Sequence, residues 1–337
     1  MQINTCAPAK TILFGEHYVV YGACGIAAAI EPYNIMQVIF EKQQTGSLQY
    51  FSTIKKMNLN INAQCFDKKI EHPIHAMYDY YCKKYTQTNN LKISANVKKV
   101  WELKGVGNSA SLCACFSYAM RKANAVSNTA QEIFEDVEVG EKVAHGSPSG
   151  IDAGAVCFGG AIEFKKMFTQ KPKITKMQIH TDLEHTFFLV DTYKKDKKRS
   201  NTKDMIDTFA KQNGIDKTLD QMEQKEREQI CKPYTPIFDM AKKAFAQCDM
   251  KLLATAMQKN HALLSKSGVC SQSIEDVVQI CKDNGALGAK VSSAGGYGGA
   301  VVGICKKQEY TQIAESLEEN GFAIHKFKIA DKGVHEV

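Results

Sequence analysis

The hydrophobic pattern of this 337-residue chain changes its period close to Gly107. Before that point, short segments rich in β-branched or alternating apolar residues predict strands. They cover Thr11 to Phe14, Ile35 to Glu41, Leu48 to Ser52, Leu59 to Ala63 and Leu91 to Val97. After it, Leu112, Phe116 and Met120 recur at helical spacing, behind a possible cap at Asn108 or Ser109. The pattern therefore predicts that a sheet comes first and that a helix begins at the glycines.

Two further helices are expected to accompany this sheet. The first has one apolar face, formed by Ile74, Met77, Tyr78 and Tyr81. The second is announced by the capping box Thr129-Ala130-Gln131-Glu132. Its apolar stripe runs through Ile133, Val137 and Ala144, and Glu141 falls on the same stripe. A carboxylate is thus expected on a buried helix face.

The second half of the chain is predicted to be mostly helical. The expected helices are Pro236 to Gln247, Lys251 to Ser265, and Ser273 to Asn284 with a Ser273…Asp276 box and Gly285 beyond its end. Strands at Val301 to Ile304 and Ile324 to Ile329 flank one more helix. The segment 165–184 is basic and irregular, and a strand at 187–190 follows it. Together with the chain length, this predicts two domains, 1–175 and 176–337.

Composition narrows the classes of partner. The net charge of +7 would suit an anionic ligand, but the densest basic run, Lys194 to Arg199, is interrupted by Asp196 and lacks aromatic residues. We therefore expect a solvated loop there and no nucleic-acid partner. The twelve cysteines include no CxxC pair, which favours reduced, mostly buried thiols in a cytoplasmic protein. The sequence shows no secretion signal and no stretch of apolar residues long enough to cross a bilayer, so no membrane partner is expected.

The segment Gly105-Val106-Gly107-Asn108-Ser109-Ala110-Ser111 stands before a predicted helix. The first turn of a helix offers unpaired N–H groups and the positive end of the helix dipole, so a phosphate would be stabilised there. A tight connection without a ligand explains the same pattern. The GxxxxGK[ST] pattern is absent, so a P-loop fold is not supported.

Two carboxylates follow in a more specific arrangement, Glu141 on the apolar stripe and Asp152 after His145-Gly146-Ser147-Pro148-Ser149-Gly150-Ile151. Burial of an unpaired carboxylate costs several kcal/mol, roughly. Glu141 is therefore expected to face a metal ion or a positive side chain. A structural salt bridge to a lysine or arginine accounts for it equally well.

Polar groups also mark both ends of the first predicted strand. Lys10 precedes it, and Gly15-Glu16-His17 follows it. Loop residues are usually polar, so these groups need have no special role. Without further context, His17 is expected to be a structural histidine held by hydrogen bonds. A second glycine-dense loop, Ser292 to Gly299, leads into an apolar strand and would suit either an anion or a tight strand entry.

These segments, in this order, resemble the GHMP kinases, and most closely the mevalonate kinase family among them. Residues 7–22, APAKTILFGEHYVVYG, are similar to the first motif of that family, and 145–152, HGSPSGID, are similar to its most specific signature. Residues 257–264, 268–269 and 285–290 resemble its C-terminal half, so the likeness covers nearly the whole chain. The resemblance implies an α/β (α+β) GHMP kinase fold. Its N-terminal domain would be like ribosomal protein S5 domain 2 and its C-terminal domain ferredoxin-like, with the active site between them.

The resemblance also implies roles. Gly105 to Ser111 would wrap the phosphates of ATP as co-substrate, Ser109 and Glu141 would hold Mg²⁺, and Asp152 beside Lys10 would face the acceptor hydroxyl. Mevalonate would be the acceptor, with Glu16, His17 and Ser149 lining its side. A homodimer is compatible with the resemblance.

The chain departs from the family pattern in two loops. Lys104 and Asn108 change the second motif, where Asn108 is still expected to cap the helix. Ser293 and Tyr297 interrupt the third, whose path is expected to differ because these residues tolerate positive φ less well than glycine. Three alternatives stay open: a GHMP kinase for phosphomevalonate or a sugar, a non-catalytic sensor of the same fold, and a basic nucleic-acid-binding protein.

Overall fold

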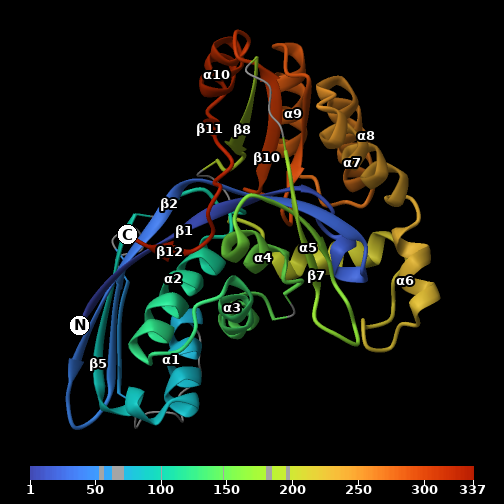
Figure 1. Cartoon of the computed structure of the whole chain (residues 1–337). Coiled ribbons are helices and arrows are strands. Elements are labelled where there is room, and N and C mark those ends of the chain that lie inside the picture. The colour runs from blue at the N-terminus through green and yellow to red at the C-terminus, as the bar shows by residue number, and fades with distance from the viewer. Residues whose placement is uncertain (53–56, 63–71, 100, 147, 180–183, 195–197) are drawn as a thin grey trace.

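The computed structural model describes residues 1–337 except 53–56, 63–71, 100, 147, 180–183 and 195–197. Its strands form two sheets (Figure 1). The first sheet has the order β12-β1-β2-β5-β3-β4, with β6 on β2 and β7 on β6. Its strands are β1 (Gln2–Phe14), β2 (Cys24–Lys42), β3 (Ser47–Ser52), β4 (Met57–Asn62), β5 (Leu91–Lys99), β6 (Ala161–Lys165), β7 (Lys173–Met177) and β12 (His335–Glu336). All neighbours are antiparallel except β3 and β5, which are parallel.

Helices cover one face of this sheet (Figure 1). They are α1 (Pro73–Lys84), α2 (Asn108–Ala123), α3 (Ala130–His145) and α4 (Ile151–Phe158), and two short 3₁₀ turns lie at Tyr18–Tyr21 and Thr86–Asn90. The predicted face of α1 is buried, and the capping box of α3 is present at Thr129 and Glu132. On the predicted stripe of α3, Glu141 is buried as expected, whereas Ala144 is exposed because the helix ends one residue later.

The second sheet has the order β11-β8-β10-β9 and is antiparallel throughout. It comprises β8 (His185–Asp191), β9 (Gly288–Ser292), β10 (Ala300–Lys306) and β11 (Ala323–Phe327). The helices of this half are α5 (Thr202–Gln212), α6 (Gln224–Cys231), α7 (Thr235–Gln247), α8 (Met250–Lys266), α9 (Gln272–Asp283) and α10 (Tyr310–Glu319). The predicted capping box Ser273…Asp276 was wrong. The helix α9 begins at Gln272, one residue before Ser273, and its N-cap residue is Ser271.

The two sheets meet where β1 and β2 are buried on both faces. Side chains alternate along a strand, so Ala28 packs into the core of the second half while Ala27 packs against the helices of the first. The chain end also crosses between the sheets, since Ala330 N donates to Ala29 O (2.9 Å) and β12 pairs with β1. The predicted boundary at 175/176 falls inside β7, a strand of the first sheet. The division into two domains remains a prediction.

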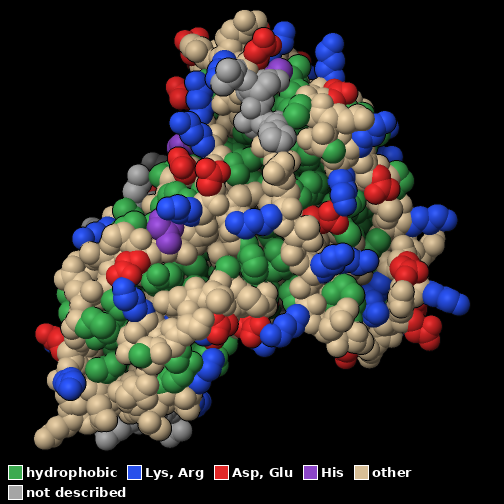
Figure 2. All heavy atoms as spheres, in the orientation of Figure 1, with side chains coloured by type: hydrophobic (Ala, Val, Ile, Leu, Met, Phe, Trp, Pro, Cys, Tyr) green, Lys and Arg blue, Asp and Glu red, His purple; other side chains and the backbone are tan. Residues whose placement is uncertain are grey.

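Several helices and strands were not predicted from the sequence. The strands β6, β7, β9 and β12 and the helices α4, α5 and α6 were not predicted, and β1 and β2 are much longer than expected. The structure does not describe the end of the strand predicted at Leu59 to Ala63, part of the segment 165–184, or half of the run Lys194 to Arg199. Lysine and arginine side chains on the face shown in Figure 2 are interspersed with acidic and apolar ones. No helix of the described part of the chain has the length and apolar character needed to span a membrane.

Candidate active site

Lys10 lies inside β1, and the expectation that it precedes the strand was wrong. The strand continues through Pro8 because the pairing with β2 shifts register between Ala7 and Ala9, and a proline, which has no N–H to donate, is tolerated at such an irregularity. The Lys10 side chain is fully buried, and its Nζ lies 2.9 Å from Oδ1 of Asp152. A buried lysine of the first sheet therefore lies against the first turn of α4.

Asp152 occupies that turn because Gly150 adopts a left-handed conformation and starts the helix. Ile151 N donates a hydrogen bond to the Ser149 hydroxyl (3.4 Å), which fixes the chain just before it. The side chain of Asp152 is about one quarter exposed (25%), in contrast to that of Lys10. An ionised carboxylate that is held by a buried cation and still reachable from outside suits a proton acceptor.

The first glycine loop packs directly on Lys10. The backbone N–H of Lys10 donates to Val106 O (2.9 Å), and a Cβ placed on Gly107 would come within 2.7 Å of Lys10 Cγ. Gly107 also has a left-handed φ of +69°, which a side chain would disfavour. The loop therefore needs glycine here both for its conformation and for contact with the lysine.

Asn108 does not cap α2, contrary to expectation. Its side-chain amide instead donates to the carbonyls of Trp101 (2.6 Å) and Leu103 (3.2 Å), and Gly107 is the N-cap residue. Gly107 has no side chain with which to cap the first turn of α2, and no cap hydrogen bond comes from the described residues. Its free N–H groups are therefore left available for an anion.

Ser109 and Glu141 supply two oxygen atoms without partners. The Ser109 hydroxyl and Glu141 Oε1 are both shielded from solvent, and neither has a hydrogen-bond partner among the described residues. The other carboxylate oxygen of Glu141 lies 3.6 Å from His145 Nε2, one turn along α3. Burial raises the pKa of Glu141, an effect opposed by His145 and reinforced by the charge of Asp152. Unsatisfied hard oxygens of this kind fit Mg²⁺.

Glu138 is a third carboxylate at this place, and sequence reasoning missed it. It lies one turn before Glu141 on α3, and its own Oε1 is buried without a partner among the described residues. Burial, with smaller contributions from Glu141 and Asp152, raises the pKa of Glu138 to about 7. Glu138 and Glu141 are three positions apart, and this spacing would have predicted that their side chains lie on the same face of α3. The concentrated negative charge further favours a cation.

Glu16 and His17 are buried at the junction of the two sheets. Glu16 pairs with Lys290 of β9, and both side chains are fully buried. Burial raises the pKa of Glu16 and lowers that of Lys290, while each partner opposes the shift of the other. His17 Nε2 donates to Ala294 O (3.0 Å), and its ring stacks on Phe209 (5.0 Å). Burial lowers the pKa of His17 to about 4, so the ring is neutral at pH 7.

The second glycine loop is anchored to β1 by residues that the sequence patterns did not single out. The hydroxyl of Ser292 donates to Ile12 O (3.0 Å), accepts from Ile12 N (3.2 Å) and lies 3.1 Å from the hydroxyl of Thr11. Ser293 adopts a φ of +63°, a conformation expected to be unfavourable for serine. A Cβ on Gly105 would lie 3.3 Å from that of Ser293. The two glycine loops therefore lie against each other beside Lys10.

Known proteins resemble this chain in sequence and in fold. A family model described as GHMP kinases C terminal matches residues 241–323. The curated mevalonate kinase of Aeropyrum pernix is 25% identical over 97% of this chain and 96% of its own length, and that of Pyrococcus furiosus is 26% identical over 88% of each. A crystal structure of L. major mevalonate kinase in complex with R-mevalonate superposes with a TM-score of 0.74 at 25% identity, covering 97% of this chain and 96% of that one. Lactococcus lactis galactokinase, complexed with galactose, shares the fold with a TM-score of 0.78 at 15% identity, over 100% and 95% of the two chains.

The fold is that of the GHMP kinases, and the relatives indicate a kinase that phosphorylates an alcohol group. The predicted fold class is thereby confirmed. Among the GHMP kinases, the chain is most like the mevalonate kinases.

Proposed function

We propose that this chain is an ATP-dependent mevalonate kinase, which transfers the terminal phosphoryl group of ATP to the 5-hydroxyl of mevalonate in the mevalonate pathway of isoprenoid biosynthesis. The observation that carries the proposal is the ion pair between Lys10 and Asp152, 2.9 Å apart against the first glycine loop. The names of its relatives across nearly the full chain support the choice of acceptor.

In this proposal Asp152 is the general base. The acceptor oxygen forms the new O–P bond, its proton passes to the Asp152 carboxylate, and the bond to the ADP leaving oxygen breaks. Lys10 holds the carboxylate in position and steadies the negative charge that develops on the attacking oxygen. Phosphoryl transfer needs alignment and charge stabilisation more than covalent chemistry, which this pair supplies.

The phosphates of ATP are assigned to the loop Gly105 to Ser111 and to the uncapped first turn of α2. Ser109 and Glu141 would hold Mg²⁺ through their unpartnered oxygens. The ion would neutralise phosphate charge and so supply part of the electrostatic stabilisation. Glu138, also without a partner for one oxygen, would add negative charge to the same place.

The acceptor side is assigned to Glu16, His17 and Ser149. Neutral His17 donates through Nε2 to Ala294, so its Nδ1 lone pair is the group left to accept a hydrogen bond from a ligand hydroxyl. Glu16 is held by Lys290 and has one oxygen without a partner among the described residues. Both residues would shape the acceptor side through hydrogen bonds and not through net charge.

The test measures Mg²⁺-dependent ADP release with ATP and, in parallel, mevalonate, 5-phosphomevalonate and galactose. Turnover with mevalonate alone, lost in Asp152→Asn, is the expected result. Turnover confined to another acceptor would overturn the substrate and keep the mechanism. The absence of turnover with every acceptor, despite ATP binding, would favour a non-catalytic sensor.

A cytoplasmic location and a homodimeric state belong to the same proposal. The cysteines of the described residues are free thiols, which supports a reducing compartment. Light scattering coupled to size-exclusion chromatography tests the dimer, and a monomer at working concentration would contradict it.

A further inference from the structure

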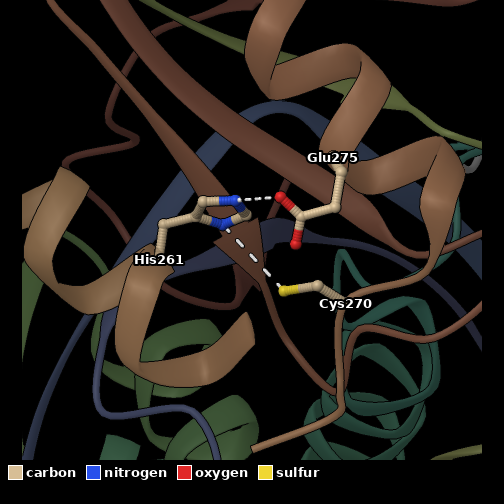
Figure 3. A group of neighbouring side chains, drawn as sticks. All are labelled: His261, Cys270 and Glu275. Carbon is tan, nitrogen blue, oxygen red and sulfur yellow. Dashed lines mark hydrogen bonds and ion pairs between the residues drawn. The ribbon is translucent and has the colours of Figure 1, made fainter. Parts of the chain in front are cut away.

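A second group of metal-ligating side chains lies beside β9, in elements of the second half of the chain. His261 of α8, Cys270 of the following loop and Glu275 of α9 converge, with one ligand atom of each within 4.8 Å of the others (Figure 3). His261 Nε2 is 3.1 Å from Glu275 Oε2, and His261 Nδ1 is 4.0 Å from Cys270 Sγ. The imidazole thus lies between a carboxylate and a thiol.

The hydrogen bonds around His261 define its tautomer. Val291 N donates to Nδ1 (3.4 Å), so in the neutral ring Nδ1 carries the lone pair and Nε2 carries the proton that Glu275 accepts. The lone pair of Nδ1 is on the side of the ring that faces the sulfur of Cys270 (Figure 3). In the protein without metal, Glu275 therefore holds the imidazole through Nε2–H, and the ring presents Nδ1 beside the thiol.

Glu275 is held in place but remains accessible. Its Oε1 accepts a hydrogen bond from the Ser265 hydroxyl (2.6 Å), and its side chain is 38% exposed. The His261 side chain is 10% exposed, and Cys270 is half-buried. A cation from solution can therefore reach the group on the side of Glu275.

We propose that His261, Cys270 and Glu275 form a binding site for a thiophilic divalent cation of the Zn²⁺ class. Nitrogen, sulfur and carboxylate oxygen are the three donor types that Zn²⁺ takes in proteins, whereas Mg²⁺ takes oxygen donors. With Zn–N near 2.0 Å and Zn–S near 2.3 Å, tetrahedral donors lie about 3.3 to 3.5 Å apart. To complete the set, the cation would take the Nδ1 lone pair in place of the Val291 N–H, Cys270 would approach Nδ1, and the partly exposed Glu275 would turn from Nε2 to the cation. Binding displaces the proton of the Cys270 thiol to solvent.

The site is connected to the second glycine loop. The residues on either side of Cys270 both bond Gly296: Val269 O accepts from Gly296 N (2.7 Å), and the Ser271 hydroxyl donates to Gly296 O (3.1 Å). A cation on Cys270 would therefore fix the backbone that positions this loop. This inference does not depend on mevalonate being the acceptor.

The experiment titrates the reduced protein with Co²⁺ in saturating Mg²⁺ and follows the thiolate-to-cobalt charge-transfer absorption, with Zn²⁺ affinity measured by calorimetry. One equivalent with a charge-transfer band is expected. In Cys270→Ser the band should vanish and the Zn²⁺ affinity should fall by at least about 10- to 100-fold, since even the loss of an outer-shell partner costs that much. His261→Gln should weaken binding similarly.

Two matched variants separate this site from other sources of metal binding. Cys248→Ser removes an exposed free thiol and should retain the band, and Glu141→Gln should retain it although that variant changes the proposed Mg²⁺ ligands. Thermal melting of Cys270→Ser without metal checks that it folds. A band that is absent from the unaltered protein, or that persists in Cys270→Ser, would overturn the proposal.

Discussion

Lys10 and Asp152 form an ion pair that joins β1 of the first sheet to the first turn of α4, with Nζ 2.9 Å from Oδ1. Only the aspartate of the pair reaches solvent. This asymmetry separates the two roles, because the accessible carboxylate can receive a proton while the buried ammonium group holds it in position.

The first prediction concerns this pair. Asp152→Asn should lower kcat by about 10²- to 10⁴-fold, the usual contribution of general base catalysis, while ATP affinity changes little. Lys10→Met should lower kcat as well, because the carboxylate loses the cation that holds it in position and the attacking oxygen loses a nearby positive charge. Steady-state kinetics and ATP binding by calorimetry measure the two effects separately. The surface variant Asp276→Asn serves as the control, and a loss of ATP binding with kcat intact would contradict the assigned roles.

The second prediction uses the contact between Gly107 and Lys10. A Cβ at 107 would lie 2.7 Å from Lys10 Cγ, and the left-handed φ adds a cost of its own. Gly107→Ala should therefore lower both stability and kcat. Gly214→Ala is the matched control, since its φ is +65° and no atom lies within 4 Å of the added Cβ. That variant should lose only about 1 to 2 kcal/mol of unfolding free energy. Equal kcat values for Gly107→Ala and the unaltered protein would show that the loop does not position the lysine.

Local periodicity was enough to predict α2 and α3, two of the helices that carry the site, but not α4, which carries Asp152. The 3.6-residue pattern and the capping box placed α3, and the same stripe placed Glu141 inside the fold. A strand was harder to delimit, because Pro8 interrupts the alternation that would have extended β1 back over Lys10. Local rules describe one element at a time, so an irregularity that the neighbouring strand accommodates is invisible to them.

The partners of the site residues could not be predicted at all from spacing. Lys290 and Glu16 are 274 positions apart, and a lysine excess of this size offers many candidate partners for a buried carboxylate. Ser292 likewise bonds Thr11 across the two sheets. Such contacts depend on how the sheets pack, and packing is a property of the whole chain.

The third prediction concerns pH and His17. Burial lowers its folded-state pKa to about 4, below the value of about 6.5 in an unfolded chain. The unfolded state therefore binds the proton more readily. The stability from this residue is fully present above pH 6.5 and is lost as the pH falls from about 6.5 to about 4, amounting to about 3 kcal/mol.

Denaturant unfolding between pH 7 and pH 4 tests this effect. His17→Gln keeps an N–H for Ala294 but removes the titration, so its stability should fall by about 3 kcal/mol less over the same range. The exposed His325→Gln should follow the unaltered protein. Identical pH slopes for the unaltered protein and His17→Gln would exclude His17 as the titrating group.

The last prediction concerns Glu16 and Lys290, whose side chains are both fully buried between the two sheets. Lys290→Met leaves Glu16 as an uncompensated buried charge, and breaking a buried pair in this way costs about 3 to 5 kcal/mol. The double variant Glu16→Gln/Lys290→Met should recover most of that loss, because it removes both charges from the interior. Denaturant unfolding measures both, with Lys217→Met as a control for the exposed pair with Glu226, where a much smaller loss is expected. If the double variant is no more stable than Lys290→Met, the loss comes from packing at β9 and not from the buried charge of Glu16.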